Sequence, residues 1–317
     1  MLRIAGVPAA KPPYGISLLL MLVKTRHTDI TGKIPVPSPG PASGVEMSTL
    51  AQLRSGPVLT GPVRSQRHHL LTLTSGALRP TVDFAEYAMA PGQWLWVRPG
   101  QVRQWGDLQG AEGTLVSFER DFLDPDTAIG VCADDPHAPV LRVPSTEDHA
   151  LLRVATSQLQ WECSAAERTP LDTHLQVLRH LLAVLALRVS GLPARGGLLT
   201  EPSEVYLAFR DAVERDFAGT KRLSDYAGAL AYSPRTLSRA TLAAAGVPAK
   251  EFIDRRVVLE AKRMLACTDL AAARIGARLG FSSATNFNKF FHQRTGTTPI
   301  AFRASVNQEP LGPPRQR

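Results

Sequence analysis

The stretch IGARLGFSSATNFNKF, residues 275–290, decides the fold of the C-terminal part of the chain. It predicts a short apolar helix, a tight turn, and a second helix whose outward face is polar and basic. The stretch LSDYAGALAYSPRTLSR, residues 223–239, has the same design. A helix-turn-helix has this form, and its second helix is the one that enters the major groove of DNA. Residues 221–303 therefore predict two helix-turn-helix units.

In the first unit, the residues after the turn set the second helix. Ser233 suits the N-cap, where its hydroxyl accepts from a free backbone N–H, and Pro234 suits the first helical position. Leu237 points inward, and Gly246 ends the helix. Arginine can donate two hydrogen bonds to guanine, and hydroxyl groups can contact several base edges. We therefore expect DNA contacts from Arg235, Thr236, Ser238 and Arg239.

In the second unit, Thr268 or Asp269 is expected to cap the first helix, Gly280 makes the turn, and Ser282 or Ser283 caps the second helix. Three phenylalanines anchor the second helix to the core: Phe287, Phe290 and Phe291. The side chains expected to face DNA are Thr285, Asn286, Asn288 and Lys289.

A single helix is predicted between the two units, over 249–266, because this segment contains no Gly or Pro. At 1.5 Å per residue it is about 27 Å long. Successive major grooves on one face of DNA lie about 34 Å apart. One chain could therefore reach two successive grooves.

This part of the chain resembles the AraC/XylS family of bacterial transcription regulators. The residues that carry the resemblance are SPRTLSR at 233–239, IGARLGFSS at 275–283 and GTTP at 296–299. The resemblance implies that both second helices bind adjacent major grooves. The chain departs from the family pattern at Ala240 and Thr241, where relatives usually have a large apolar residue followed by Phe.

The positive charge is concentrated in the same region. The formal net charge of the 317 residues is +8, and residues 232–305 hold 12 Lys and Arg against 4 Asp and Glu. Residues 1–200 hold 18 against 17. Contact with DNA phosphates requires such a local basic excess.

The three cysteines, Cys132, Cys163 and Cys267, are far apart in the sequence and form no CxxC motif. This pattern is typical of a reducing compartment and argues against a disulfide framework or a zinc site. We therefore expect a cytoplasmic protein.

Residues 1–46 predict little ordered structure, because Pro, Gly, Ser and Thr dominate 25–44. The apolar run 16–23 is too short to span a bilayer, so we expect no membrane partner. This segment is interpreted as a disordered extension, or as upstream of a true start at Met47.

Residues 58–140 predict short strands separated by Pro/Gly turns, a pattern typical of a β-barrel or jelly roll. The strands are expected over 69–74, 79–87, 94–97, 102–105 and 114–118. The segment from Ala90 to Val102 resembles the cupin-type sensor domain found in many AraC relatives. That resemblance implies a small barrel whose mouth binds an effector, with His69, Trp94, Trp96, Arg98 and Arg103 as candidate pocket residues.

A metal-dependent cupin enzyme is the alternative that these histidines raise. Such a site needs His-x-His with a carboxylate and a further His. His68 and His69 are adjacent, so on a strand they point to opposite faces. No further His occurs before His137. We therefore expect no metal, no cofactor and no enzymatic activity.

Apolar spacing predicts helices within 146–190, whose apolar stripes are expected either to pack on the barrel or to contact a partner chain. The resemblance to AraC relatives, in which such helices mediate dimerisation, favours a dimer interface. The composition of 191–197 is that of a flexible linker, and Glu204–Phe217 is expected to begin the DNA-binding domain. The predicted class is α+β with two domains. The predicted segments are 1–46 (extension), 47–192 (cupin-like effector-binding and dimerisation domain), 193–202 (linker), 203–305 (double helix-turn-helix domain) and 306–317 (disordered tail).

The predicted function is sequence-specific, effector-responsive regulation of transcription, with activation as the family's usual mode. The expected partners are double-stranded promoter DNA, an unidentified small-molecule effector, a second copy of the chain, and RNA polymerase. Two alternatives remain open at this point. One is an architectural DNA-binding protein without a ligand, and the other is a cupin enzyme fused to a DNA-binding domain.

Overall fold

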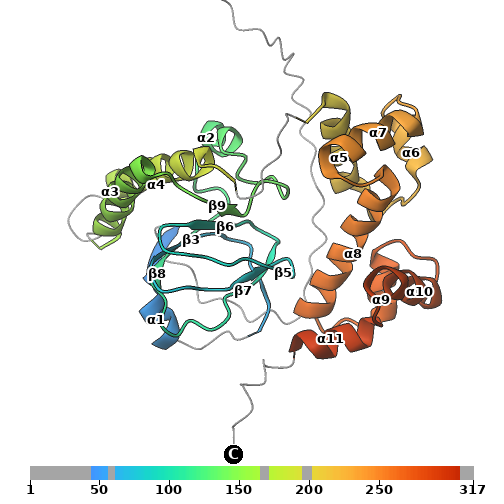
Figure 1. Ribbon diagram of the computed structural model, residues 1–317, viewed down its shortest axis with the longest axis horizontal. Helices are drawn as coiled ribbons and strands as arrows, with labels where there is room; N and C mark the ends of the chain where they lie inside the picture. The colour runs from blue at the N-terminus through green and yellow to red at the C-terminus, as the bar shows by residue number, and fades with distance from the viewer. Residues whose placement is uncertain (1–43, 56–60, 165–170, 195–201, 308–317) are drawn as a thin grey trace, which may run out of the picture. The chain divides into compact units, whose positions relative to one another are not determined.

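The computed structural model describes residues 44–55, 61–164, 171–194 and 202–307. The described residues up to 194 combine strands and helices, and those from 202 onward are entirely helical (Figure 1). The predicted α+β class, with a helical C-terminal part, is therefore confirmed.

The strands form two antiparallel sheets. The first has the order β1 (Val45–Thr49), β8 (Glu112–Phe118), β3 (His68–Ser75), β6 (Trp94–Val97) and β9 (Leu141–Arg142). The second has the order β2 (Val63–Arg64), β7 (Val102–Gln104), β4 (Thr81–Val82) and β5 (Ala85–Glu86). Among the described residues no strand pairing joins the two sheets into one closed barrel.

The first sheet is buried on both faces. Successive side chains of a strand point to opposite faces, so Leu70 and Leu71 enter different cores. Leu70 packs with Trp96 against helical residues, whereas Leu71 packs with the side chains of the second sheet. This burial explains why β6 is a continuous apolar run and why the first six residues of β3 are all buried, the polar ones included.

The strand predicted over 79–87 is wrong. The structure has a tight hairpin there, β4 and β5, which turns at Asp83 and Phe84 with φ values of 52° and 67°. Among two-residue hairpin turns, type I′ has positive φ at both turn positions, and Gly, Asn or Asp usually occupies them. The alternation of residues 79–87 does not indicate this turn.

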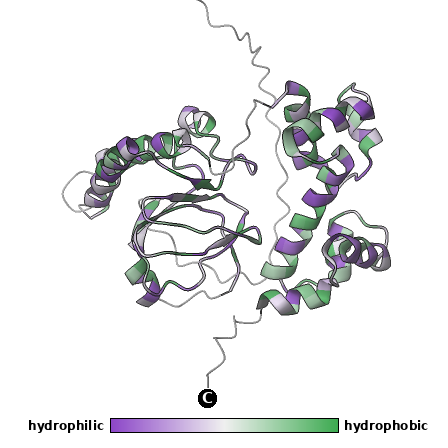
Figure 2. Ribbon diagram, viewed as in Figure 1, coloured by the Kyte–Doolittle hydropathy of each residue, from purple (hydrophilic) through white to green (hydrophobic). Residues whose placement is uncertain are grey.

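In the described ranges between 44 and 194, four helices accompany the sheets: α1 (Leu50–Ser55), α2 (Pro125–Gly130), α3 (Thr146–Cys163) and α4 (Leu171–Gly191). The last two pack against each other, and their apolar stripes cover the Trp96 face of the first sheet. Figure 2 shows both helices as mixtures of hydrophobic and hydrophilic residues. The helices predicted within 146–190 are therefore confirmed.

Residues 202–307, as described, contain seven helices: α5 (Glu204–Asp216), α6 (Leu223–Ala229), α7 (Pro234–Ala245), α8 (Ala249–Cys267), α9 (Ala272–Arg278), α10 (Ala284–Thr295) and α11 (Pro299–Asn307). They enclose two separate cores. Ile253 in the first half of α8 belongs to one core, and Val257 in its second half belongs to the other. The long helix therefore joins two helix-turn-helix units, as the sequence predicts.

The predicted caps are confirmed in part. Ser233 and Ser283 cap α7 and α10 through their side chains, and Gly246 ends α7 in the left-handed conformation. The cap predicted for α9 is wrong, since Ala271 occupies that position without a side-chain hydrogen bond. Thr268 instead ends α8, where its hydroxyl donates to the Met264 carbonyl at 2.7 Å.

Several predicted segments lie outside the described residues: 1–43, most of the linker (195–201) and most of the tail (308–317). The first strand crosses the boundary that we placed before Met47, because Val45 is buried and pairs with Phe118. In the part of the chain that the structure covers, no helix is both long and apolar enough to cross a membrane.

Ion pairs connect α8 to the ends of the strands. Arg263 donates to both carboxylate oxygens of Asp83, at 2.8 and 2.7 Å. Arg64 donates to Glu260 at 2.7 Å. The helix that joins the two helix-turn-helix units is thus also bonded to the sheet-containing part.

Candidate nucleic-acid interface and ligand site

The N-terminal turns of α7 present basic side chains to solvent. Arg235 and Arg239 are exposed, and Ser238 is half-buried. Thr236 is exposed but belongs to the cap, because its N–H donates to Ser233 Oγ at 3.0 Å. The cap fixes the start of the helix, and fully buried Leu237 fixes its rotation about its own axis.

Helix α10 has the same construction. Thr285, Asn288 and Lys289 are exposed, whereas Phe287 and Phe291 are fully buried on the other face. The predicted anchor Phe290 is only half-buried. The Asn286 amide is already engaged, since Nδ2 donates to Ser282 Oγ at 3.0 Å. Thr285, Asn288 and Lys289 are therefore the better placed of the four predicted residues.

The angle between α9 and α10 depends on Gly276, which the sequence analysis did not single out. A Cβ at this position would lie 2.8 Å from Phe287 Cβ and 2.9 Å from its Cγ. The missing side chain lets the two helices approach closely. The sequence does contain a sign of this contact: a glycine inside a predicted helix, next to apolar residues, often marks a place of close packing.

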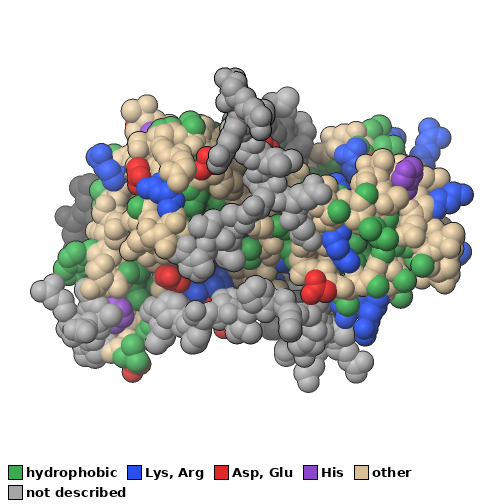
Figure 3. Space-filling model, turned by 90° about the horizontal axis from the view of Figure 1, so that it is seen from below, with side chains coloured by type: hydrophobic (Ala, Val, Ile, Leu, Met, Phe, Trp, Pro, Cys, Tyr) green, Lys and Arg blue, Asp and Glu red, His purple; other side chains and the backbone are tan. Residues whose placement is uncertain are grey.

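The twelve Lys and Arg residues of 232–305 fall into three groups. Five form ion pairs with carboxylates of the protein itself: Lys250, Arg255, Arg256, Arg263 and Arg294. Two contact groups other than carboxylates: Lys262 lies over the Phe84 and Phe302 rings, and Arg303 donates to backbone carbonyls. The other five are exposed and have no ion pair with any described residue: Arg235, Arg239, Arg274, Arg278 and Lys289. Figure 3 shows Lys and Arg side chains projecting singly from the surface.

All five unpaired side chains belong to α7, α9 and α10, that is, to the two helix-turn-helix units. Arg274 and Arg278 of α9 were not predicted. They are exposed and lie four residues apart, so they share one face of the helix. Outward arginines at this spacing are positioned to contact phosphates.

The five predicted pocket residues do not form one group. Trp94, Trp96 and Arg98 lie on the face of the first sheet that α3 and α4 cover. His69 and Arg103 lie on the opposite side, between the two sheets, next to Trp105. The structure thus separates two candidate ligand sites.

The site between the sheets contains a buried arginine. The Arg103 guanidinium stacks over the Trp105 ring at 4.6 Å, and burial lowers its pKa to about 10. His69 Nδ1 lies 2.9 Å from Ser117 Oγ. Burial, aided by the nearby charge of Arg103, holds the His69 pKa well below its usual range, so this ring is neutral at pH 7.

The site under the helices contains His68, Trp96 and Arg98. Trp96 Nε1 donates to His68 Nδ1 at 3.3 Å, and the His68 ring stacks on Phe118 at 4.7 Å. Burial, with smaller contributions from Arg98 and Arg120, lowers the His68 pKa to about 3. Arg98 is 2% exposed, and its guanidinium lies 4.9 Å from the Trp96 ring.

Within the described residues no three His, Cys, Asp or Glu side chains are grouped so as to hold a metal. The adjacent histidines point to opposite faces, as their spacing predicts: His68 contacts Phe118 and His69 contacts Trp105. Burial raises the pKa of the Cys163 and Cys267 thiols to about 11. These two cysteines are therefore protonated and poorly nucleophilic at neutral pH.

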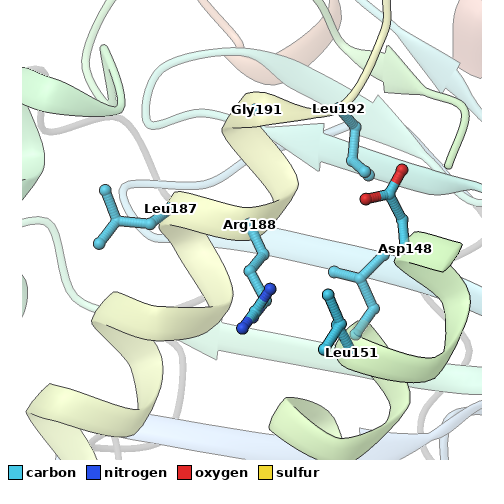
Figure 4. Close-up of a pocket in the computed structure, with 7 residues that line it drawn as sticks. Asp148, Leu151, Leu187, Arg188, Gly191 and Leu192 are labelled. Atoms are coloured by element: carbon cyan, nitrogen blue, oxygen red, sulfur yellow. The ribbon is translucent and has the colours of Figure 1, made fainter. Parts of the chain in front are cut away.

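A shallow surface hollow lies where the start of α3 meets the end of α4. Arg188 of α4 points toward the turn of α3 that carries Asp148 and Leu151 (Figure 4). Leu151 and Leu187 at its rim are 47% and 50% exposed. Further along the same helices, Val154, Trp161 and Val184 are also exposed, so this pair of helices has an apolar outer face.

Residues 226–305 match the family model described as "Helix-turn-helix domain". Over 87 residues the chain is 31% identical to the regulatory protein PocR of Salmonella typhimurium. That match covers 27% of this chain and 29% of PocR, so it spans less than a third of that relative.

Solved structures with a similar fold include ToxT of Vibrio cholerae, with 10% identity, coverage of 84% of this chain and 100% of that chain, and a TM-score of 0.41. The C-terminal domain of AraT, a response regulator of Geobacillus stearothermophilus, has 22% identity, covers 33% of this chain and 88% of its own, and has a TM-score of 0.32.

Proposed function

We propose that this chain, whose C-terminal part is an AraC-type helix-turn-helix domain, is a sequence-specific DNA-binding regulator of transcription that responds to a small molecule. The observation that carries the proposal is which Lys and Arg side chains form ion pairs within the protein and which do not. Carboxylates of the protein itself pair with four of the five basic residues of α8, all but Lys262, and with Arg294 near the end of α10. The other Lys and Arg side chains of α7, α9 and α10 are exposed and have no ion pair with any described residue. Exposed Lys and Arg side chains without a carboxylate partner therefore lie in the two helix-turn-helix units, where contact with DNA phosphates requires them.

The two units would read DNA through α7 and α10. Arg235 and Arg239 are expected to contact guanine edges, since a guanidinium matches guanine O6 and N7. Asn288 is expected to contact adenine, and Lys289 a guanine or a phosphate. Helix α8 has 19 residues, which corresponds to about 28 Å. This length suits two recognition helices placed in successive major grooves.

Residues 47–192 would form the cupin-like sensor domain of the proposal, and the two buried groups of basic and aromatic side chains support a ligand site there. The proposal includes no enzymatic step. A regulator of this kind acts on the chromosome, so we place it in the cytoplasm. Activation through contact with RNA polymerase is the proposed mode.

We propose that the regulator is a homodimer joined through the apolar outer face of α3 and α4. Leu151, Val154 and Trp161 of α3 and Val184 and Leu187 of α4 are exposed, and single-copy proteins rarely expose a contiguous apolar face. A second copy would bury this face by self-contact, which is the commonest symmetry of soluble oligomers.

The test is selection of binding sites from random double-stranded DNA by the purified full chain, followed by mapping of its chromosomal sites. The proposal expects one enriched motif in two parts, separated by about one helical turn. Enrichment without a motif would favour the architectural alternative. If no DNA were retained at low salt, the proposal would be wrong.

A further inference from the structure

The Arg98 side chain is a buried cation with unused hydrogen-bond donors. Its Nη1 reaches three backbone carbonyl oxygens at long range, 3.4 Å from Trp96, 3.3 Å from Ala138 and 3.4 Å from Pro139. Its Nε and Nη2 are buried and have no hydrogen-bond partner. Buried polar groups nearly always have a hydrogen-bond partner, so the two free donors Nε and Nη2 of this charged side chain need an explanation.

The two unused atoms lie on the same edge of the guanidinium. The Nε–H and Nη2–H bonds are parallel, and together they match the two oxygens of a carboxylate. The lowering of the Arg98 pKa to about 10, caused mainly by burial, leaves the group charged at pH 7. This edge is therefore a positively charged fork without its usual partner.

His68 adds a third unused donor. An indole N–H can only donate, so the bond from Trp96 Nε1 shows that His68 Nδ1 accepts. The proton of the neutral ring must then be on Nε2, which is buried and has no hydrogen-bond partner. The Nε atom of Arg142 is a fourth unused donor, and the Arg142 charge is close enough to lower the Arg98 pKa.

We propose that His68, Arg98 and Arg142 form a carboxylate site, in which Arg98 binds the carboxylate of a small organic acid along its Nε–Nη2 edge. All the unused atoms are donors, so the ligand must supply acceptors. A planar monoanion fits this edge better than a tetrahedral phosphate. Trp96 and Phe118 beside the donors offer apolar surface to the organic body. The further statement that this acid is the effector of the regulator rests on the proposed function.

The nearby carboxylates of the protein are engaged elsewhere. Asp134 forms an ion pair with Arg120, whose Nε lies 3.0 Å from Oδ1, and the same oxygen lies 3.7 Å from His68 Nε2, too far for a hydrogen bond. Asp135 accepts from Arg210 at 3.2 Å and from the His137 N–H at 2.9 Å. Neither aspartate hydrogen-bonds Arg98, although both raise its pKa slightly by their charge.

The segment 131–140 connects the proposed site to the C-terminal helices, because it contacts both Arg98 and α5. Its carbonyl oxygens at Ala138 and Pro139 accept from Arg98. From the same segment, His137 Nε2 lies 2.9 Å from Glu214 of α5. A ligand that draws the Arg98 guanidinium toward itself would release these long carbonyl contacts, and through them change the position of a segment bonded to α5.

The first experiment measures the melting temperature of the wild-type full chain with sodium acetate, benzoate and 3-phenylpropionate at constant ionic strength. The corresponding amides and inorganic phosphate are the controls. At least one acid should raise the melting temperature by about 3 °C for each tenfold increase in concentration above its Kd. Its amide should have no effect. If none of the acids exceeds its amide, or if phosphate matches the best acid, the proposal is wrong.

The second experiment compares Arg98→Met with Arg79→Met, which removes an arginine that is exposed and paired with Glu86. Without ligand, Arg98→Met should melt at the wild-type temperature or above it, because it removes an uncompensated buried charge. It should also lose the response to the acid, whereas Arg79→Met keeps it.

A response that persists in Arg98→Met would overturn the proposal. If Arg98→Met failed to fold, the comparison of acid and amide on the wild-type chain would still decide the question. DNA-site selection without any acid tests the proposed function separately, so the failure of one proposal does not imply the failure of the other.

Discussion

Arg239 is the residue at which base reading and phosphate contact can be told apart. It is exposed on α7, close to the capped helix start, and has no ion pair with any described residue. We expect Arg239→Ala to weaken binding to the selected site by about 1–3 kcal/mol, a factor of roughly 5 to 150, and to relax the base preference at one position. Binding curves on selected and random DNA measure this effect.

Arg79→Ala is the matched control, because Arg79 is also exposed but lies in the sheet-containing part. It should leave both curves unchanged. If Arg239→Ala weakened selected and random DNA equally and lowered the salt slope by about one, Arg239 would be a phosphate contact and not a base contact.

His68 should make stability depend on pH in the mildly acidic range. Its pKa is about 3 in the folded protein and near 6.5 in the unfolded chain, so the unfolded chain binds this proton first. Stability is therefore fully present above pH 6.5 and falls as the pH decreases toward 3, by about 1.4 kcal/mol per pH unit at most. We expect His68→Gln to flatten the dependence between pH 7 and 5.

Urea unfolding at pH 7, 6 and 5 measures this effect. Carboxylates with low pKa values titrate below this range, which leaves the histidines as the main source of the slope. His69 is also buried with a lowered pKa, so part of the slope should persist in the variant. An unchanged slope in His68→Gln would mean that His68 takes up its proton at the same pH in the folded protein as in the unfolded chain.

At the scale of elements, the sequence predicts what depends on local order. The caps Ser233 and Ser283 and the turn at Gly280 follow from residue types with one dominant use, so both helix-turn-helix units were predictable. The hairpin at Asp83 was not, because its positive φ values are held by distant groups: Gln101 Nε2 donates to Asp83 at 3.0 Å, and Arg263 donates to both of its oxygens.

The candidate ligand site shows the same limit of prediction from local sequence. Alternation along β6 correctly places Trp94 and Trp96 on one face. It does not reveal that this face meets α3 and α4 and not the second sheet. That choice depends on the packing of helices more than forty residues away in the sequence, and it separates Arg98 from Arg103.

The outer face of α3 and α4 provides a prediction at this scale. We expect Leu187→Glu to weaken self-association by roughly a hundredfold, because a dimer would bury an unpaired charge at the interface. Ile129→Glu is the matched control, since Ile129 is 75% exposed on α2. Sedimentation velocity over a range of concentrations measures both variants. A Leu187→Glu protein that associates like the wild type would place the interface elsewhere.

At the scale of the whole molecule, Glu260 occupies the centre of the bonds between α8 and the sheets. Its carboxylate accepts from Arg64 at 2.7 Å, from Arg256 at 3.2 Å and from Arg263 at 3.4 Å. Burial alone would raise its pKa, but the three guanidinium groups outweigh burial and lower the pKa to about 2. Arg64 comes from β2 and the other two from α8, so a single carboxylate connects the two parts.

We therefore expect Glu260→Gln to destabilise the protein by about 3 kcal/mol at pH 7, as the pKa change from 4.5 to about 2 implies. The carboxylate contributes this stability above pH 4.5 and loses it as the pH falls toward 2, so the variant should respond less to acid in that range. Because the lost bonds join two parts with separate cores, the variant should also unfold in two transitions by calorimetry. Glu251→Gln is the control: its partners Arg255 and Arg294 are 63% and 38% exposed, so it should cost less than about 1 kcal/mol. A single transition in Glu260→Gln, with a loss no larger than that of the control, would show that the two parts are held together by other contacts.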